Sequence, residues 1–365
     1  MAKVTHIFAE IIEEGAKQQF DSAMDQPFAV QGALMPDAHQ GYSLPIGAVV
    51  ATDGMIIPAW VGYDIGCGMC AVPTSFIRQE VTANAEAIFK QLYKRIPVGF
   101  AHNQHGQPWD CGHLPRTSFM QETYNAGGPK QIGTLGGGNH FIEIGYDEEG
   151  RVWIIIHSGS RNLGHKTATY YMKAASGDGK AREGHFGFPV DSDNGKDYIM
   201  DLNFCLEFAL RNRLVLMERV FKVVGEFCAG TAAWPELINR NHNHAELKDG
   251  LWIHRKGATH AEDGMTGVIP GNMRDGSFII KGKGNPDALW SSSHGAGRVL
   301  GRKAAQQKLT VEQFSDTMNG IVAKIDANTL DESPFAYKDI FEVMRLQSDM
   351  VEIMHHVKPL INVKG

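Results

Sequence analysis

Residues 140–157 read HFIEIGYDEEGRVWIIIH, and this stretch shows how the chain builds its sheets. Two apolar runs rich in β-branched residues, 141–144 and 152–156, flank a turn from Asp147 to Gly150. A β-hairpin of these runs would bring His140 and His157 to the same end of a sheet. We therefore expect a sheet that carries two imidazoles at one end.

Helical periodicity alternates with such strands along the rest of the chain. Apolar residues at helical spacing predict helices at 7–24, 82–96, 198–227, 311–319 and 339–356, the fourth started by a capping box of Thr310 and Gln313. Further strands are expected at 251–253, 277–281 and 360–365, and a hairpin around Asp53-Gly54 over 46–58. Irregular loops are expected near 98–130 and 177–195.

This order of elements lacks the regular βαβ rhythm of a doubly wound sheet. The sequence predicts an α+β fold, a single compact mixed α/β domain over residues 1–365, and not a Rossmann sheet. The run GAGRVLG at 295–301 resembles a dinucleotide fingerprint, but Trp290 to His294 before it is not an apolar strand.

Composition bounds the class of protein. The chain has 365 residues, of which 43% are hydrophobic, and a net charge of −6, which does not point to nucleic-acid binding but leaves room for a local basic patch. No apolar run reaches 18 residues, and no signal-peptide core follows residues 1–6, so we expect a cytoplasmic protein without a membrane segment. Five thinly spread cysteines predict reduced thiols.

A carboxylate and a thiol lie three positions apart at Asp64 and Cys67, within YDIGCGM at 63–69. They can turn toward one ion only if the backbone between them bends, and Gly66 and Gly68 permit such bends. This pair predicts half of a metal site.

Three histidines in small-residue or amide-rich surroundings are candidates for the other half: His140, His157 and His242. Asn241 and Asn243 flank the last of these and are expected to fix its ring tautomer. Each histidine alone is more often structural. Together with the carboxylate and the thiol they supply enough ligands for two ions that share a bridging sulfur.

Two rival interpretations use other cysteines. Cys67 and Cys70 form a C-x-x-C, as in redox dithiols, but Val72-Pro73 would break the helix which that motif requires. A second possible metal cluster lies in the irregular loop, with a spacing that matches no common zinc pattern. Its members are His102, His105, Cys111 and His113.

His294 opens the run HGAGR, which we expect to form a glycine-rich helix start with Arg298 and Arg302 on the next turn. Helix-start amides and guanidinium groups bind phosphate well. An imidazole beside phosphate donors and metals suits attack on phosphorus to form a phosphoramidate, so His294 is the candidate nucleophile. The loop GTLGGG at 133–138 either approaches phosphate closely or is a mere tight turn.

Seven motifs together resemble the RtcB family of GTP-dependent RNA ligases, in order and spacing, from MPDAH at 35–39 to Gly365. They are DIGCGM (64–69), LGGGNHFIE (135–143), HSGSR (157–161), RKGA (255–258), SHGAGR (293–298), AYKD (336–339) and VKG (363–365).

The resemblance implies an enzyme that joins RNA 2′,3′-cyclic phosphate or 3′-phosphate ends to 5′-hydroxyl ends, in RNA repair or tRNA splicing. His294 would form a histidine-GMP adduct with GTP, and GMP would pass to the RNA to give an RNA(3′)pp(5′)G intermediate. Two Mn²⁺ ions are implied, one held by Cys67, His157 and His242, the other by Asp64, Cys67 and His140.

The resemblance also assigns supporting roles. Glu143 would accept hydrogen bonds from guanine N1 and N2, and Tyr337 would lie against the ring. The remaining implied nucleotide contacts are Asn139, Asn272, Gly295, Gly297 and Lys364. The implied RNA or phosphate contacts are Arg161, Arg298 and Arg302, while Asp37 and His39 would support the metals.

The sequence departs from the family pattern at Gln40 to Pro45, where many relatives have a Gly-Lys-Gly type loop, and at Asn272, where a serine is expected. Ligand softness alone would favour zinc or iron, and only the resemblance favours manganese. Two alternatives stay open: a binuclear metal phosphoesterase acting on RNA ends, and a non-enzymatic RNA-end-binding protein. The RNA substrate and any activating protein are not specified by the sequence.

Overall fold

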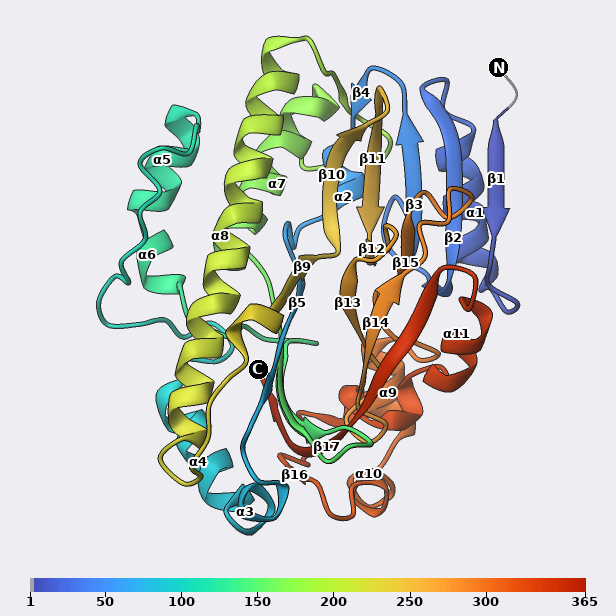
Figure 1. Ribbon diagram of the computed structural model, residues 1–365. Helices are drawn as coiled ribbons and strands as arrows, with labels where there is room; N and C mark the ends of the chain where they lie inside the picture. Colours follow the sequence, from blue (N-terminus) through green and yellow to red (C-terminus); the bar gives the residue numbers. More distant parts are fainter. Residues whose placement is uncertain (1–2) are drawn as a thin grey trace.

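Two twisted β-sheets share one apolar core in the computed structural model, which describes residues 3–365 (Figure 1). The smaller sheet has the order β1 (Val4–Ile7), β2 (Ala29–His39), β3 (Ile46–Thr52), β11 (Leu251–Lys256) and β10 (Asn243–Lys248). The larger has the order β13 (Thr266–Pro270), β14 (Ser277–Gly282), β17 (Val351–Lys364), β6 (Phe141–Tyr146), β7 (Val152–Ser158), β5 (Gly68–Thr74) and β9 (Ile238–Asn241), with β16 (Val322–Ala323) beside β17.

Short ladders join β12 (Ala258–His260) to β15 (Ser291–Ser293) and β4 (Met55–Ile56) to β8 (Phe188–Pro189). Among the named strands of residues 3–365, the only parallel pairings are β1 with β2 and β16 with β17. All other named strands pair antiparallel, which is incompatible with a doubly wound sheet. The expected mixed α/β fold of non-Rossmann type is thereby confirmed.

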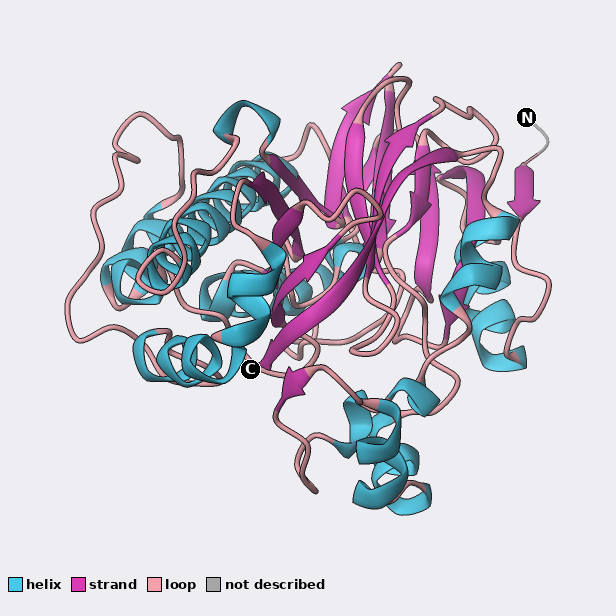
Figure 2. Ribbon diagram, turned by 60° about the horizontal axis from the view of Figure 1, so that its bottom comes forward, coloured by secondary structure: helices cyan, strands magenta, loops and turns pink. Residues whose placement is uncertain are grey.

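Helices cover the outer faces of the sheets, and the long α8 lies along the larger sheet (Figures 1 and 2). The α-helices are α1 (Glu14–Met24), α2 (Pro58–Val61), α3 (Arg78–Ala83), α4 (Ala85–Arg95), α5 (Ser118–Asn125), α6 (Gly128–Gln131), α7 (Arg161–Ser176), α8 (Asp193–Val224), α9 (Arg302–Lys308), α10 (Val311–Thr317) and α11 (Ile340–Leu346). Single 3₁₀ turns are η1 (Trp234–Glu236), η2 (Leu330–Glu332) and η3 (Pro334–Ala336).

Several predicted elements are confirmed, with shifted ends. The hairpin of β6 and β7 pairs Phe141 with His157, the helix at 82–96 is α4, and the long helix is α8. The capping box starts α10. The Thr310 hydroxyl accepts from the Gln313 N–H at 3.2 Å, and the Gln313 side chain accepts from the Thr310 backbone N–H. The loop near 98–130 also contains α5 and α6, and the loop near 177–195 contains β8 and the start of α8.

Three predictions were wrong. The helix expected over 339–356 ends at Leu346, and the chain continues as β17, because pairing with β14 and β6 satisfies its backbone. Ile353 and Met354 in this strand are about half exposed. The helix expected from residue 7 begins at Glu14, because Val4–Ile7 pairs with β2 and Ile11 is exposed.

The third error is the hairpin over 46–58. Gly54 does adopt a positive φ of 64°, as a tight turn requires, but only Met55 and Ile56 are extended beyond it. They pair with β8, while β3 pairs with β2 and β11. No helix within residues 3–365 is long and apolar enough to cross a membrane, and none of the five cysteines forms a disulfide.

Candidate metal centre and nucleotide pocket

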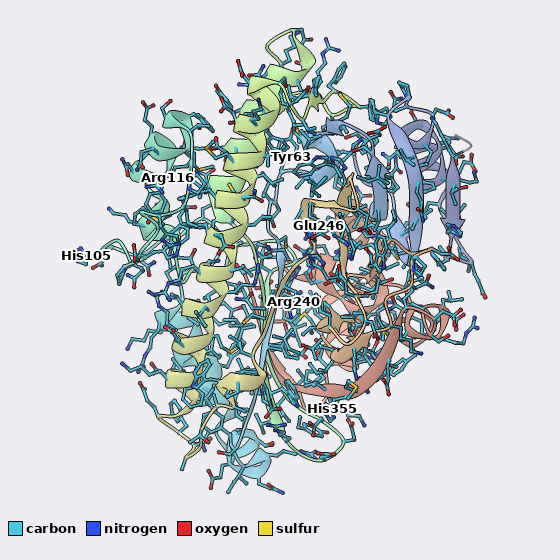
Figure 3. All side chains as sticks on the ribbon, turned by 45° about the horizontal axis from the view of Figure 1, so that its top comes forward. Tyr63, His105, Arg116, Arg240, Glu246 and His355 are labelled. Carbon is cyan, nitrogen blue, oxygen red and sulfur yellow. The ribbon has the colours of Figure 1, made fainter. Side chains whose placement is uncertain are left out.

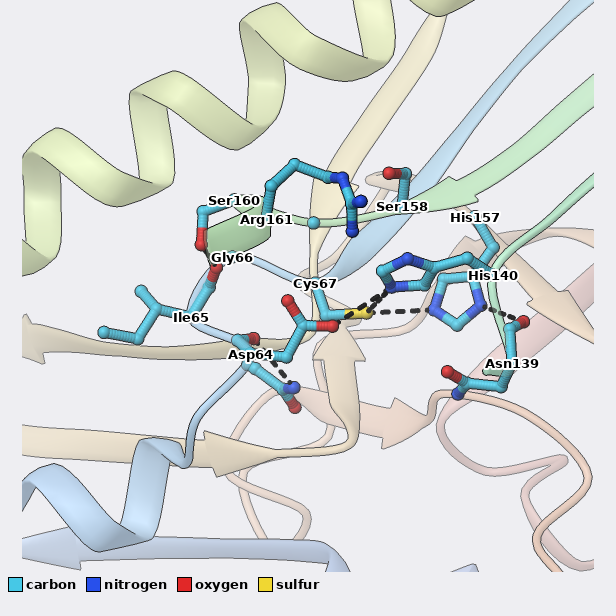
Figure 4. A network of polar contacts seen from close by, with 12 residues as sticks. Asp64, Ile65, Gly66, Cys67, Asn139, His140, His157, Ser158, Ser160 and Arg161 are labelled. Atoms are coloured by element: carbon cyan, nitrogen blue, oxygen red, sulfur yellow. Dashed lines mark hydrogen bonds and ion pairs between the residues drawn. The ribbon is translucent and has the colours of Figure 1, made fainter. Parts of the chain in front are cut away.

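Five predicted ligands converge at the ends of four strands of the larger sheet, and Figure 4 shows four of them, Asp64, Cys67, His140 and His157. Asp64 and Cys67 precede β5, His140 precedes β6, His157 is the next-to-last residue of β7, and His242 follows β9. The antiparallel pairing of β5, β6, β7 and β9 makes these ends meet. The site therefore depends on sheet topology, which gathers residues 178 positions apart in the sequence.

The donor atoms lie within contact distance of one another. Cys67 Sγ lies 3.1 Å from His157 Nε2 and 3.4 Å from His140 Nε2. Asp64 Oδ2 lies 3.0 Å from His140 Nε2, and His157 Nε2 lies 3.2 Å from His242 Nε2. Cys67 is the member that contacts two imidazoles, as a bridging ligand must.

Backbone carbonyls fix the tautomers of two rings. His140 Nδ1 donates to the Leu135 carbonyl at 3.0 Å, and His157 Nδ1 donates to the Asn139 carbonyl at 3.1 Å. Because a carbonyl only accepts, the protons of the neutral rings sit on Nδ1 and both Nε2 lone pairs face the thiol. Buried lone pairs that face each other are costly unless a cation binds them, so the donor set fits metal ions.

The prediction that Asn241 and Asn243 fix the ring of His242 was wrong. Asn241 accepts from Arg213 at 2.6 Å, and Asn243 accepts from the Gly257 N–H at 2.7 Å. His242 Nδ1 is buried without a protein partner among the described residues. The two amides thus order the surrounding backbone and leave the imidazole itself free.

The bend between Asp64 and Cys67 relies on glycine, as predicted. Gly66 has a φ of 73°, which a larger residue rarely adopts. Gly68 packs so closely on the backbone of Arg240 that a Cβ would collide with the Arg240 carbonyl. Arg213, fully buried on α8, donates to the carbonyls of Gly66 at 2.7 Å and Ser158 at 2.9 Å and so joins the two ligand loops.

Burial keeps the Cys67 thiol and the rings of His157 and His242 neutral when no ion is bound. It raises the pKa of the Cys67 thiol well above its usual value, with the Asp64 charge adding to the effect. Burial also lowers the pKa of His157 and His242 well below the ordinary value. A bound cation would reverse the first effect, because it stabilises the thiolate.

A cavity of about 200 Å³ opens beside the metal ligands. It is lined by the expected nucleotide residues Asn139, Glu143, Asn272, His294, Gly295, Gly297, Tyr337 and Lys364, together with His39, His157, Arg298, Arg302 and Asn362. One wall thus belongs to the metal centre through His157. The opposite part of the lining is the loop after β13 that carries Asn272.

Glu143 is the buried carboxyl of this cavity. Its side chain is 1% exposed, and Oε1 has no hydrogen-bond partner among the described residues. Burial raises its pKa to about 8. An unpartnered acceptor in a cavity favours a ligand with N–H donors at that point.

His294 is oriented by Asp37 and not by a helix. The Asp37 carboxylate, fully buried, lies 2.7 Å from His294 Nδ1 and accepts from the backbone N–H groups of His294 at 3.2 Å and Gly295 at 3.3 Å. The expected helix start was wrong, because residues 294–301 form a loop and α9 begins at Arg302. Burial would raise the pKa of Asp37, but the His294 imidazole holds it below its usual value.

With its proton on Nδ1, the His294 imidazole presents a lone pair at Nε2. Its ring lies beside the candidate metal ligand His242, at 4.9 Å between centroids. His39 completes this corner through Nδ1, 2.9 Å from the Asp37 carbonyl, and burial lowers its pKa to about 4. Of the two residues expected to support the metals, Asp37 thus contacts His294 directly, and His39 contacts Asp37.

Arg298, Arg302 and Lys364 surround two acidic residues that the sequence analysis missed, Asp331 and Glu332 of η2. Arg302 pairs with both carboxylates, and Lys364 Nζ lies 2.6 Å from Glu332. Arg298 lies 3.4 Å from Glu332, whose other oxygen accepts from the Tyr337 hydroxyl at 2.7 Å. Three cations thus face two carboxylates at the edge of the cavity.

Arg161 does not line the cavity. Its guanidinium donates to the Gly99 carbonyl at 2.6 Å and the Thr134 hydroxyl at 3.0 Å, and its backbone φ is 59°. These bonds fasten the 133–138 loop, so that loop is a positioned turn beside His140. The structure gives Arg161 a role in holding the loop.

Both rival cysteine interpretations lack structural support. His102, His105 and His113 are exposed and Cys111 is in the core, and Figure 3 shows His105 far from the sheets. Cys70 packs among apolar side chains of β5 and α8. A third group, His244, Glu246 and His260, has ligand-like spacing. Arg255 already pairs with its one carboxylate, Glu246, at 2.5 Å, and we assign no metal to it.

Comparison with known proteins decides the family. A family described as "tRNA-splicing ligase RtcB" matches residues 19–111 and 110–365. The chain belongs to the RtcB family. It is 34% identical to the RNA-splicing ligase RtcB of Escherichia coli K12, over 97% of this chain and 95% of that protein. It is 28% identical to the tRNA-splicing ligase RtcB of Thermococcus kodakarensis, over 91% and 87%.

The RtcB-family chain is also 29% identical to the RNA-splicing ligase RtcB2 of a second Escherichia coli strain, over 97% of this chain and 93% of that protein.

Sequence reasoning missed Arg213, Asp331, Glu332 and Asn362 as parts of the site. Arg213 carried a signal: it lies in mid-helix among apolar residues, where a charge is rarely buried without a role. The other three sit in ordinary-looking surroundings.

Proposed function

We propose that this RtcB-family protein is an RNA ligase that uses GTP to join an RNA 3′-phosphate to a 5′-hydroxyl, with His294 as the nucleophile. The observation that carries the proposal is the contact of Asp37 with His294 Nδ1 at 2.7 Å. It leaves Nε2 as the free lone pair, at a cavity wall shared with the metal ligands. RNA-splicing ligase is the printed name of the Escherichia coli K12 relative.

The reaction has three steps. His294 Nε2 attacks the α-phosphorus of GTP, and the bond to the leaving pyrophosphate breaks. An oxygen of the RNA 3′-phosphate then attacks the same phosphorus, the N–P bond breaks, and RNA(3′)pp(5′)G forms. The RNA 5′-hydroxyl finally attacks the 3′-phosphorus, and GMP leaves. A 2′,3′-cyclic phosphate end is first hydrolysed to the 3′-phosphate.

Residues of this chain supply binding and orientation for these steps. Glu143 accepts from guanine N1–H and N2–H, and Asn139, Asn272, Gly295, Gly297, Tyr337 and Lys364 form the rest of the nucleotide site. Arg298 and Arg302 face the phosphates. The hydroxyl of Tyr337 is held by its hydrogen bond to Glu332 at 2.7 Å.

Two Mn²⁺ ions are proposed as the resident metals, one on Cys67, His157 and His242 and the other on Asp64, Cys67 and His140. When bound, they neutralise phosphate charge and make the phosphorus more electrophilic. The substrates are GTP and RNA with broken ends, from damage repair or tRNA splicing, and the domain spans the described chain.

The test is incubation of the manganese-loaded protein with GTP labelled at the α-phosphate, followed by denaturing electrophoresis. We expect an acid-labile, alkali-stable labelled band that is absent from His294→Ala, with unchanged metal content in that variant. A matched control is His254→Ala, because His254 is a buried histidine outside the site. A band that persists in His294→Ala would overturn the nucleophile, and no band with metals present would favour the phosphoesterase.

A further inference from the structure

A second cavity adjoins the nucleotide cavity on the side of the divergent 40–45 loop. Its volume is about 460 Å³, and its lining is Glu13, His39, Gln40, Gly41, Tyr42, Ile46, Arg298, Gly301 and Arg302. Four of these, His39, Ile46, Arg298 and Arg302, also line the nucleotide cavity. A phosphate bound at the shared wall would therefore be within reach of ligands in both cavities.

An aromatic side chain, Tyr42, lines this second cavity, with Lys256 Nζ 5.9 Å from its ring centroid. Tyr42 is 63% exposed, and its ring meets Tyr63 at 89°, with 6.5 Å between centroids, so the two rings do not cover each other face to face. Tyr63, seen in Figure 3, stacks on His165 at 5.0 Å. Tyr63 directly precedes the metal ligand Asp64, which ties this aromatic row to the site.

The charges at the second cavity suit a phosphate on one side only. Arg298 and Arg302 lie at the shared wall, where with Lys364 they outnumber the Asp331 and Glu332 carboxylates. The acidic member of the lining, Glu13, accepts from the N–H of Gln40, two residues before Tyr42, at 3.2 Å. A bound nucleotide is thereby directed with its phosphate toward the arginines and its base toward Tyr42.

The proposed reaction requires a binding site for the RNA 3′ end next to the nucleotide cavity. The RNA 3′-phosphate must approach the phosphorus held on His294, so the terminal nucleoside must occupy space that adjoins the nucleotide cavity. Bases stack on tyrosine regardless of their identity, which suits an enzyme that meets broken ends of varied sequence.

Resting on the proposed function, we infer that this second cavity binds the terminal nucleotide of the RNA 3′ end, with Tyr42 stacking on the base and Arg298 and Arg302 contacting the 3′-phosphate. Tyr42 and the glycine before it belong to the segment in which this chain departs from many relatives. The segment thus supplies an aromatic contact to the RNA in place of the basic side chain.

The test is the affinity of the manganese-loaded protein for a fluorescent single-stranded RNA that ends in a 3′-phosphate, measured by anisotropy without GTP. Tyr42→Ala should raise Kd about 5- to 150-fold, the range for loss of one stacked base, and Tyr42→Phe should retain the affinity. The matched control is Tyr170→Ala, which removes a 46%-exposed tyrosine from α7 and should change nothing.

A second RNA, identical but lacking its terminal base, makes the test specific. Removal of the base should weaken binding to the wild-type protein as much as Tyr42→Ala does, and should have no further effect in Tyr42→Ala. Equal Kd values for wild type and Tyr42→Ala, or an equal effect of base removal in both, would overturn the subsite. Guanylylation of the wild-type protein is measured separately, so its absence would count against the proposed function alone.

Discussion

The buried carboxyl of Glu143 predicts that guanine affinity depends on pH. With its pKa raised to about 8 by burial, this carboxyl is protonated at neutral pH in the nucleotide-free protein. The proposed contact with guanine N1–H and N2–H needs two accepting oxygens, hence the ionised form. Binding below pH 8 must therefore release a proton, and affinity for guanine should rise as pH rises toward 8.

The size of the pH effect on GMP affinity follows from the raised pKa of Glu143. One pH unit corresponds to about 1.4 kcal/mol, so GMP should bind about tenfold more weakly at pH 7 than on the plateau above pH 8. Glu143→Gln cannot ionise and should bind GMP more weakly with no such slope. Its amide also presents a donor to the donors of the base, a mismatch that costs several kcal/mol in a buried site.

The assay is calorimetric titration of metal-free protein with GMP, which cannot guanylylate His294, from pH 6.5 to 8.5. The GMP phosphate ionises in the same way in titrations of both proteins. Subtracting the pH profile of Glu143→Gln from that of the wild-type protein therefore cancels its contribution. IMP, which lacks the N2 amino group, should show the same slope at lower affinity. A flat wild-type profile, or the same slope in Glu143→Gln, would refute the role of this carboxyl.

The raised pKa of Glu143 also makes the stability of the folded protein depend on pH. The folded-state pKa lies above the ordinary value of 4.5, so the nucleotide-free protein binds a proton that the unfolded chain has lost. The stability that this group contributes is fully present below pH 4.5 and is lost as pH rises through 8, at about 1.4 kcal/mol per unit. Urea unfolding of wild type and Glu143→Gln over pH 5.5 to 8 should show this difference in slope.

Three further predictions concern other parts of the site. Cys67→Ala should lose bound metal, measured by elemental analysis, because the Cys67 thiol contacts two imidazoles. The control Cys70→Ala, which removes an equally buried thiol, should keep its metal. A full metal load in Cys67→Ala would contradict the bridging role. Asp37→Asn should slow guanylylation on the order of 10²- to 10⁴-fold at unchanged metal content, because the Asn amide favours the His294 tautomer with its proton on Nε2. Rapid-quench rates equal to those of the wild-type protein would disprove this role of Asp37. Arg213→Ala should lower the unfolding free energy by roughly 3–5 kcal/mol in urea denaturation, because it leaves buried carbonyls of both ligand loops without a donor. The half-buried Arg211→Ala is the control, and equal stability of the two variants would count against that account.

The β6–β7 hairpin, α4, α8 and the α10 capping box could be predicted from sequence, because each depends on neighbours within a few residues. The errors share one cause. Residues 351–356 carry a helical pattern yet form a strand, since β14 and β6 supply partners that lie far away in the chain. Met55 and Ile56 likewise pair with β8. Long-range pairing overrides local periodicity where the two conflict.

The sequence by itself determined the types of ligand and their local settings: the bend at Gly66, the histidines at strand ends, and the motifs that place the chain in the RtcB family. Only the tertiary structure decided which groups meet. The contact between Asp37 and His294 joins residues 257 positions apart, and Glu332 reaches Lys364 through β17. The physical reason is that hydrogen bonds, burial and pKa shifts act over a few ångströms in space, whereas sequence motifs report only on positions along the chain.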